Sequence, residues 1–139
     1  MLEYQLDYGP DSPIGRATCR MQLEPQAFLE NLAAARTFIS VETARQLQSR
    51  GLARHVTEQD LLVFDELGPV NNKLRYADEC GRHKLLDLVG DLALAGVDLV
   101  GEVLACRSGH QLNGQLAEKL RVLAQAECSP LPSFENYAA

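Results

Sequence analysis

The sequence predicts an α+β fold in which helices cover one face of a mostly antiparallel sheet, giving a two-layer sandwich. Patterns typical of strands and of helices alternate irregularly along the 139 residues, and no internal repeat is visible. The composition, with 46% hydrophobic and 23% charged residues, is that of an ordinary soluble globular protein. We expect one domain over residues 1–126 and a loose tail or linker, rich in proline, over residues 127–139.

The first third of the chain predicts two strands and a helix. Residues 3–7 and 14–23 are typical of strands, and the turn YGPDSP between them reverses the chain through its glycine and prolines. Pro25 is tolerated in a first helical turn, so a helix is expected from there to about Ala35. Residues 36–39 (RTFI) then predict a short extended segment.

The middle of the chain predicts a helix and a buried strand. Ser40 is a suitable N-cap for a helix that ends near Gly51. The apolar run LLVF at 61–64 indicates a short buried strand, and LGPVNN after it has the composition of a turn.

The last part predicts a long helix, a strand and a second helix. Asp78 is expected to cap a helix that continues through Ala95 and ends at Gly96. Residues 98–107 indicate a further strand, and residues 112–126 a further helix.

Charge and hydropathy exclude several classes of protein. The net charge is −6 and the 13 basic residues are scattered, which argues against nucleic-acid binding by clustered cations. No apolar run approaches the roughly 20 residues that a transmembrane helix needs, and the first residues lack a signal-peptide pattern. A cytoplasmic location is therefore the default expectation. The four cysteines form no C-x-x-C pair and are expected to be free thiols (Cys19, Cys80, Cys106, Cys128).

One face of the long helix carries a row of polar side chains. At 100° per residue, His83, Asp87 and Asp91 follow one another along it, with Lys84 beside them. The opposite face is apolar and must pack on the core (Leu85, Leu86, Leu88, Val89, Leu92, Ala93). A solvated polar face is the plainest interpretation. The alternative is a metal site, because an imidazole and a carboxylate at i and i+4 can reach one zinc ion.

A second motif, Ser108-Gly109-His110, directly follows a predicted strand, where loops often carry catalytic groups. Alone, this histidine would be interpreted as capping the next helix. Together, LRYADECGRHKLLDLVGDLALAG and ACRSGHQLN resemble the second domain of the UDP-3-O-acyl-N-acetylglucosamine deacetylases of lipid A biosynthesis. The segments YQLDYGPDSPIG, AAARTF, SRGL and DLLVFDE occur in the order expected for that family, so the resemblance covers about residues 3–125.

The resemblance implies a catalytic centre. His83 and Asp87 would be zinc ligands, and His110 would be the catalytic histidine that gives a proton to the leaving amine. Asp91 would orient that imidazole and stabilise its positive charge, while the Thr37 hydroxyl would contact the tetrahedral intermediate.

The resemblance also implies a binding site for a UDP-linked acyl glucosamine. Lys84 would meet the nucleotide or phosphate end of this substrate, and Phe38 and Gly109 would also contact it. Residues 48–66 would form the inserted element that walls the passage for the acyl chain, with Leu62 on it. An ordinary core strand is the other interpretation of this apolar segment.

The sequence departs from the family at the zinc site. The family draws its third zinc ligand, a histidine, and its general base, a glutamate, from a first domain. Only three histidines are present, no Glu-His dipeptide occurs, and His55 lies in a segment that does not match. Ile39 also stands where the family often has glycine after Thr-Phe.

We therefore expect half of a zinc-dependent deacetylase, inactive alone and needing an N-terminal deacetylase domain, as a fragment or as a subunit of a split enzyme. Two alternatives remain open. One is a non-catalytic ligand-binding domain on the same scaffold. The other is a homodimer that shares one zinc ion between two His83–Asp87 pairs. Metal content and oligomeric state separate these three hypotheses.

Overall fold

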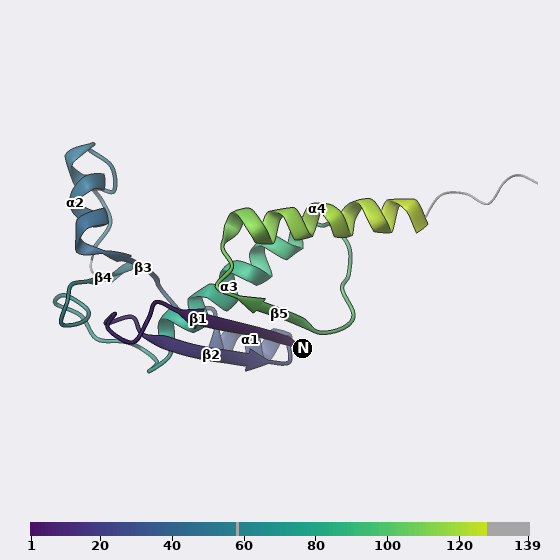
Figure 1. Ribbon diagram of the computed structural model, residues 1–139, viewed down its shortest axis with the longest axis horizontal. Coiled ribbons are helices and arrows are strands. Elements are labelled where there is room, and N and C mark those ends of the chain that lie inside the picture. Colours follow the sequence, from purple (N-terminus) through teal and green to yellow (C-terminus); the bar gives the residue numbers. More distant parts are fainter. Residues whose placement is uncertain (58, 128–139) are drawn as a thin grey trace, which may run out of the picture.

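The computed structural model describes residues 1–57 and 59–127, which form two small sheets and four helices (Figure 1). In chain order the elements are β1 (Leu2–Asp7), β2 (Arg16–Met21), α1 (Pro25–Asn31), β3 (Thr37–Ser40), α2 (Val41–Ser49), β4 (Leu61–Phe64), α3 (Glu79–Ala93), β5 (Val103–Cys106) and α4 (His110–Glu127).

The larger sheet has the strand order β2-β1-β5. β1 and β2 are antiparallel, with Leu2 opposite Met21, whereas β1 and β5 are parallel, with Leu2 opposite Val103. Alternate residues of β1 point to one face of the sheet, where Leu2, Tyr4 and Leu6 are buried. This face packs against α3.

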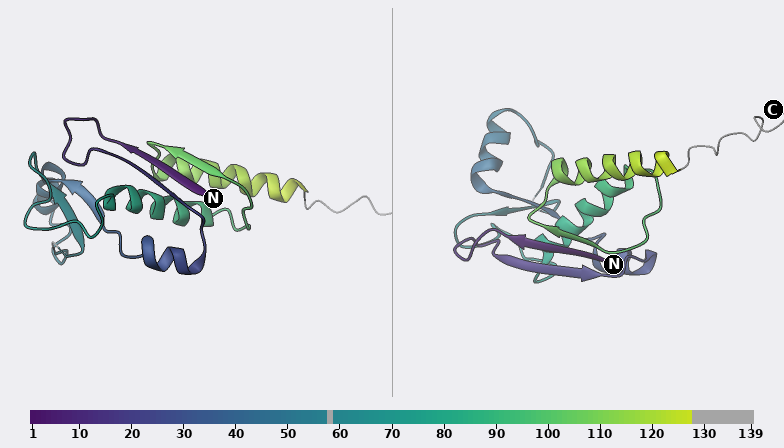
Figure 2. Two further views of the ribbon diagram at one scale, coloured as in Figure 1. Left: turned by 90° about the horizontal axis from the view of Figure 1, so that it is seen from below. Right: turned by 45° about the vertical axis from the view of Figure 1, so that its right-hand side comes forward.

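The smaller sheet pairs β3 with β4 in parallel, with Thr37 opposite Leu61. The helix α2 and the loop after it connect these two strands. This β3-α2-β4 lobe projects from the end of the larger sheet, and α2 stands at its outer side in each view (Figures 1 and 2).

The prediction of an α+β fold is confirmed, but the prediction of a mostly antiparallel sheet is wrong. Within the described residues, two of the three strand pairings are parallel. Both parallel pairs are connected through helices, since α2 lies between β3 and β4 in the chain, and α3 is the last of the helices between β1 and β5. A helical crossover returns the chain to the end from which it started, so the second strand runs in the same direction as the first.

The helix α3 packs against both sheets, contacting β1 and β2 of the larger sheet and β3 of the smaller one. Its apolar side, formed by Leu85, Leu88 and Leu92, is buried against the larger sheet. At Gly81 the helix approaches β2 closely, because a Cβ atom there would lie 2.9 Å from Cys19 Sγ. The last helix, α4, packs along α3 and buries Ala117.

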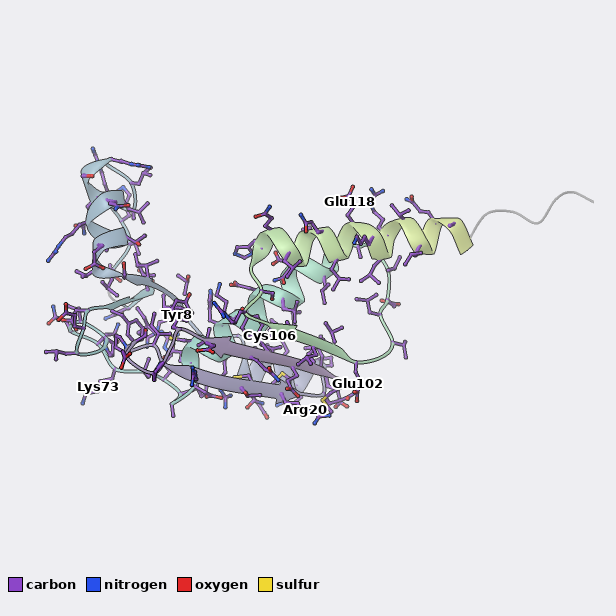
Figure 3. The ribbon with its side chains drawn as sticks, viewed as in Figure 1. Tyr8, Arg20, Lys73, Glu102, Cys106 and Glu118 are labelled. Carbon is purple, nitrogen blue, oxygen red and sulfur yellow. The ribbon has the colours of Figure 1, made fainter. Side chains whose placement is uncertain are left out.

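The other face of the larger sheet carries charged side chains. Arg20 on β2 lies 3.7 Å (Nε to Oε2) from Glu3 on β1 and 4.0 Å (Nη2 to Oε1) from Glu102 beside β5. Arg20 and Glu102 lie at the same end of the sheet in Figure 3. Exposed ion pairs of this kind are typical of a solvated surface. The apolar face of the sheet is therefore the one turned toward α3.

Of the two predicted N-cap side chains, one caps its helix and the other does not. Ser40 caps α2 as expected, accepting a hydrogen bond from the backbone of Thr43 at 3.1 Å. The side chain of Asp78 makes no capping bond to α3, because it binds Arg82 Nε at 2.7 Å instead.

The last strand and helix also begin at other residues than predicted. The predicted strand over 98–107 is reduced to β5, and α4 begins two residues earlier than expected, at His110. Apart from the last residue of α4, the predicted tail lies outside the described residues.

Candidate functional site

The polar face of α3 brings His83 and Asp87 together as the helical period requires. His83 Nε2 lies 3.3 Å from Asp87 Oδ1, and their side chains are only 15% and 13% exposed. The His83 ring also packs edge-on against the Phe38 ring, with centroids 6.2 Å apart. Both polar groups are therefore fixed in a partly desolvated position.

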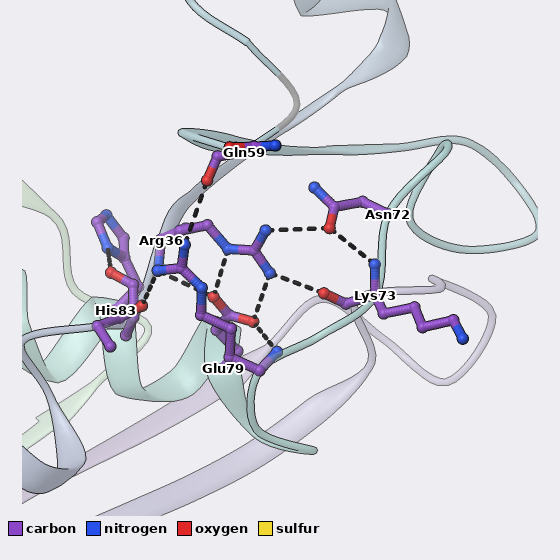
Figure 4. A network of polar contacts seen from close by, with 9 residues as sticks. Arg36, Gln59, Asn72, Lys73, Glu79 and His83 are labelled. Carbon is purple, nitrogen blue, oxygen red and sulfur yellow. Dashed lines mark hydrogen bonds and ion pairs between the residues drawn. The ribbon is translucent and has the colours of Figure 1, made fainter.

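The orientation of the His83 ring follows from a contact outside the helix. Its Nδ1 lies 3.1 Å from the carbonyl oxygen of Ala35, just before β3 (Figure 4). Because a carbonyl only accepts hydrogen bonds, Nδ1 must carry the proton and donate it. In the neutral ring, Nε2 is then unprotonated, and its lone pair faces the carboxylate of Asp87.

The separation of His83 Nε2 and Asp87 Oδ1 can be compared with that of two ligands of one metal ion. Two lone-pair donors at 3.3 Å repel each other unless a proton or a cation lies between them. Nitrogen and oxygen ligands about 2.0–2.2 Å from a tetrahedral zinc ion are about 3.3–3.6 Å apart. The pair thus fits two corners of a zinc site. Within residues 1–57 and 59–127, no group of three or more potential metal ligands occurs.

Lys84 binds the second carboxylate oxygen of Asp87. Its Nζ donates to Asp87 Oδ2 at 2.9 Å and lies 5.7 Å from the centre of the Phe38 ring. Burial alone would lower the pKa of Lys84, but the hydrogen bond to Asp87 outweighs burial and raises the pKa. Lys84 therefore places a permanent positive charge beside the His83–Asp87 pair.

The motif at the start of α4 completes the polar cluster. His110 Nδ1 lies 2.9 Å from Asp91 Oδ2, which also accepts a hydrogen bond from Asn113 Nδ2 at 2.9 Å. The other ring nitrogen of His110, Nε2, lies 3.9 Å from Asp87 Oδ2. The side chain of His110 is 69% exposed, so Nε2 is accessible at the surface next to the His83–Asp87 pair. Gly109 supplies the carbonyl that accepts from Asn113 N at 3.0 Å, in the first turn of α4.

The remaining predicted residues lie on β3 and β4. Phe38 is buried between the rings of Tyr8 and Phe64, with centroid distances of 5.8 and 6.4 Å. Thr37, its neighbour on β3, is exposed on the opposite side of the strand. Leu62 is fully buried in the core, so its side chain does not reach the surface of the described chain.

Two clefts adjoin the smaller sheet. One of about 760 Å³ lies between the β1–β2 turn and the lobe, and Tyr8, Phe38 and Phe64 line it. The other, of about 270 Å³, lies under α2 and is lined by Leu61 and Val63, the neighbours of Leu62. Apolar residues of the predicted acyl-passage segment therefore line a cleft, although Leu62 itself is not among them.

Sequence reasoning missed two groups of this site. Asn113 is 3% exposed and three residues after His110, so helical spacing from the SGH motif would have found it. The carbonyl of Ala35 could not have been found in this way, because it lies 48 residues from His83 in the chain.

Comparison with known proteins identifies the family. The family model for LpxC, UDP-3-O-acyl N-acetylglycosamine deacetylase, matches residues 1–122. The chain is 39% identical over 129 residues to a UDP-3-O-acyl-N-acetylglucosamine deacetylase of Solibacter usitatus, covering 92% of this chain and 43% of the relative. It is 43% identical over 126 residues to the protein of that name from Thermosynechococcus vestitus, covering 88% and 42%. The Haemophilus influenzae protein of that name is 37% identical over 139 residues, covering 97% and 44%.

The chain thus spans less than half the length of the curated relatives that it matches. In the described residues, no helix is both long and apolar enough to cross a membrane. The match over residues 1–122 confirms the resemblance carried by the long helix and the SGH motif. The chain belongs to the UDP-3-O-acyl N-acetylglycosamine deacetylase family.

Proposed function

We propose that this chain is the C-terminal half of a zinc-dependent deacetylase that removes the N-acetyl group from UDP-3-O-acyl-N-acetylglucosamine in lipid A biosynthesis. The names of the relatives support this substrate. The observation that carries the proposal is the convergence of His83 Nε2 and Asp87 Oδ1 at 3.3 Å, with the accessible His110 ring beside them. A solvated helix face does not require an imidazole and a carboxylate to be held this close together in a partly desolvated position.

His83 and Asp87 would hold the zinc ion, which when bound supplies Lewis acidity toward the amide carbonyl and the attacking water. Two protein ligands make an incomplete site, since a catalytic zinc takes three protein ligands. The third histidine of the sequence, His55, lies exposed in the loop after α2 and joins no ligand cluster in the described residues. The remaining ligand and the general base would come from another domain. Because this chain lacks both groups, we expect it to be inactive alone.

His110 is suited to donate a proton. Asp91 accepts from Nδ1 and so fixes the ring, which leaves Nε2 to carry the second proton toward solvent. Asn113 holds the same oxygen of Asp91 and limits its rotation. In hydrolysis, water adds to the amide carbon while the general base of the other domain would take its proton, the C–N bond breaks, and the amine nitrogen takes up the proton that Nε2 gives.

The other residues would bind and orient the substrate. The ammonium group of Lys84 would attract the anionic diphosphate of the nucleotide. The Thr37 hydroxyl would donate to the oxyanion of the tetrahedral intermediate, and Gly109 and Phe38 would contact the sugar and the acyl chain. The cleft under α2, lined by Leu61 and Val63, would lie along the acyl passage.

The proposal is tested by reconstitution. The 139-residue chain is mixed with the N-terminal half of the Thermosynechococcus vestitus relative, and release of acetate from UDP-3-O-acyl-N-acetylglucosamine is measured. We expect no turnover by the chain alone and metal-dependent turnover by the mixture. His110→Ala should lower turnover about 10²–10⁴-fold, the usual loss for an acid catalyst. Gln115→Ala, on an exposed position of the same helix, is the matched control and should have no effect.

Three outcomes would contradict the proposal. Robust turnover by the chain alone would show that its site is complete. Tight zinc binding that survives His83→Ala and Asp87→Ala would place the metal elsewhere. Full activity of the mixture that contains His110→Ala would show that His110 is not the acid catalyst.

A further inference from the structure

A buried ion pair lies one helical turn before His83, on the same side of α3. The carboxylate of Glu79 is 0% exposed and the side chain of Arg36 is 7% exposed. Arg36 Nε donates to Oε1 at 2.9 Å, and its Nη2 donates to Oε2 at 3.1 Å, so the two groups meet as a two-pronged fork (Figure 4). Such planar pairing fixes orientation as well as distance.

The pair also binds the backbone of two further segments. Each carboxylate oxygen accepts a backbone N–H, from Arg36 at 3.1 Å and from Arg75 at 2.5 Å. The remaining guanidinium donors reach Asn72 Oδ1 at 3.0 Å and the Lys73 carbonyl at 2.8 Å. The pair therefore ties the first turn of α3 to the start of β3 and to the loop that precedes α3.

Stability alone does not account for this pair. Burial opposes the charge of Glu79, but the hydrogen bonds from Arg36 and from the backbone outweigh it and hold the pKa below its usual value. The pair is thus ionised, and a buried ion pair is often no more stable than apolar residues of similar volume. Buried charges require such hydrogen bonds, so the segments that supply them are held together by the pair.

The position of the pair in the chain shows what it holds. Arg36 is flanked by Ala35, whose carbonyl accepts from His83 Nδ1 at 3.1 Å, and by Thr37, the first residue of β3. Glu79 lies one helical turn before His83 on α3. The fork between Arg36 and Glu79 therefore sets the separation between the Ala35 peptide and the imidazole.

We propose that the Arg36–Glu79 pair is a positioning pair that holds the Ala35 carbonyl against His83, and so fixes the imidazole with its Nε2 lone pair aimed at Asp87. Its consequence for metal binding rests on the proposed function, because that consequence requires His83 to be a ligand. Groups that orient a ligating histidine in this way commonly change metal affinity about 10–100-fold when they are removed.

The test removes both charges at once, because removing one would leave the other buried and unpaired. The double variant Arg36→Met/Glu79→Leu keeps the approximate volume of the pair. Its matched control is Arg82→Met/Asp78→Leu, which removes the ion pair between Arg82 and the N-cap residue of α3, with an N–O separation of 2.7 Å. Arg82 also donates to the carbonyl of Asn31 at 3.1 Å, whereas the Arg36–Glu79 pair adjoins Ala35. Three quantities are measured in the full 139-residue chain: the melting temperature, the tautomer of His83 from its ring ¹⁵N shifts without metal, and the Zn²⁺ affinity.

We expect the double variant to fold and to lose the preference for the Nδ1–H tautomer of His83, with Zn²⁺ affinity about 10–100-fold lower. The control should leave the tautomer and the affinity unchanged. If the double variant does not fold, Arg36→Lys retains a charge beside Glu79 but not the fork, and it should shift the tautomer in the same direction.

A folded variant in which His83 keeps the Nδ1–H tautomer overturns the positioning role. Failure of the proposed function would look different, because the unsubstituted chain would then show no Zn²⁺ binding dependent on His83. The tautomer comparison is made without metal and still decides the positioning role in that case.

Discussion

Gly81, on the buried side of α3, offers a test of how closely this helix is packed on the sheet. Glycine in a helix interior is normally about 1 kcal/mol less favourable than alanine, so Gly→Ala ordinarily stabilises a helix. At Gly81 the added Cβ would lie 2.9 Å from Cys19 Sγ and 3.2 Å from Ala17 Cβ. Both atoms belong to β2, and Cys19 is itself buried. The helix or the strand would have to move.

The expected magnitude combines these two effects. Overpacking a core typically costs about 1–3 kcal/mol, and the gain in helix propensity returns about 1 kcal/mol. We therefore expect Gly81→Ala to lower the free energy of unfolding by up to roughly 2 kcal/mol. Gly90 is the matched control, because it lies on the same helix, is exposed, and would place an added Cβ with no neighbouring atom within 4 Å. Gly90→Ala should raise the free energy of unfolding by about 0.5–1 kcal/mol.

Urea unfolding of the two variants, followed by circular dichroism, measures the difference. The double variant Gly81→Ala/Cys19→Ala should recover part of the loss, since the nearest obstructing atom is then absent. If Gly81→Ala stabilises the chain as much as Gly90→Ala, the close approach of α3 to β2 is incorrect. In that case the position of His83 relative to β3, which depends on the same helix, would also need revision.

Three further predictions concern stability and metal binding. Burial raises the pKa of the Cys19 and Cys80 thiols from 9.0 to about 12. Both thiols therefore stay protonated to a higher pH in the folded state than in the unfolded state. The stability that they contribute is complete below pH 9.0 and is lost as the pH rises toward 12; melts that are independent of pH over this range would contradict the burial of both thiols. Leu92→Ala should cost roughly 2–5 kcal/mol as a core cavity, and Asp91→Asn should cost less; thermal melts that rank them the other way would contradict the orientation of α3. His83→Ala should abolish the weak Zn²⁺ binding expected of the isolated chain, as measured by calorimetry, whereas unchanged binding would exclude this ligand.

The site was predictable from sequence wherever it depends on a single helix. The spacing of His83, Asp87 and Asp91 placed them on one face of α3, because the helical period relates residues four apart. The same period relates His110 to Asn113 on α4. The family followed from these two motifs, since their residue types and spacing are unusual in combination, and the family model confirms it.

Contacts between distant segments were decided only by the tertiary structure. Arg36 and Glu79 are 43 residues apart, and nothing in either local pattern predicts that a buried carboxylate would bind that guanidinium. The parallel pairing of β1 with β5 was also hidden, because a strand pattern fixes which side chains are buried but not the direction of its neighbour. Local periodicity thus determined which residues share a helix face, whereas packing of α3 against β3 and the sheet determined how His83 is oriented.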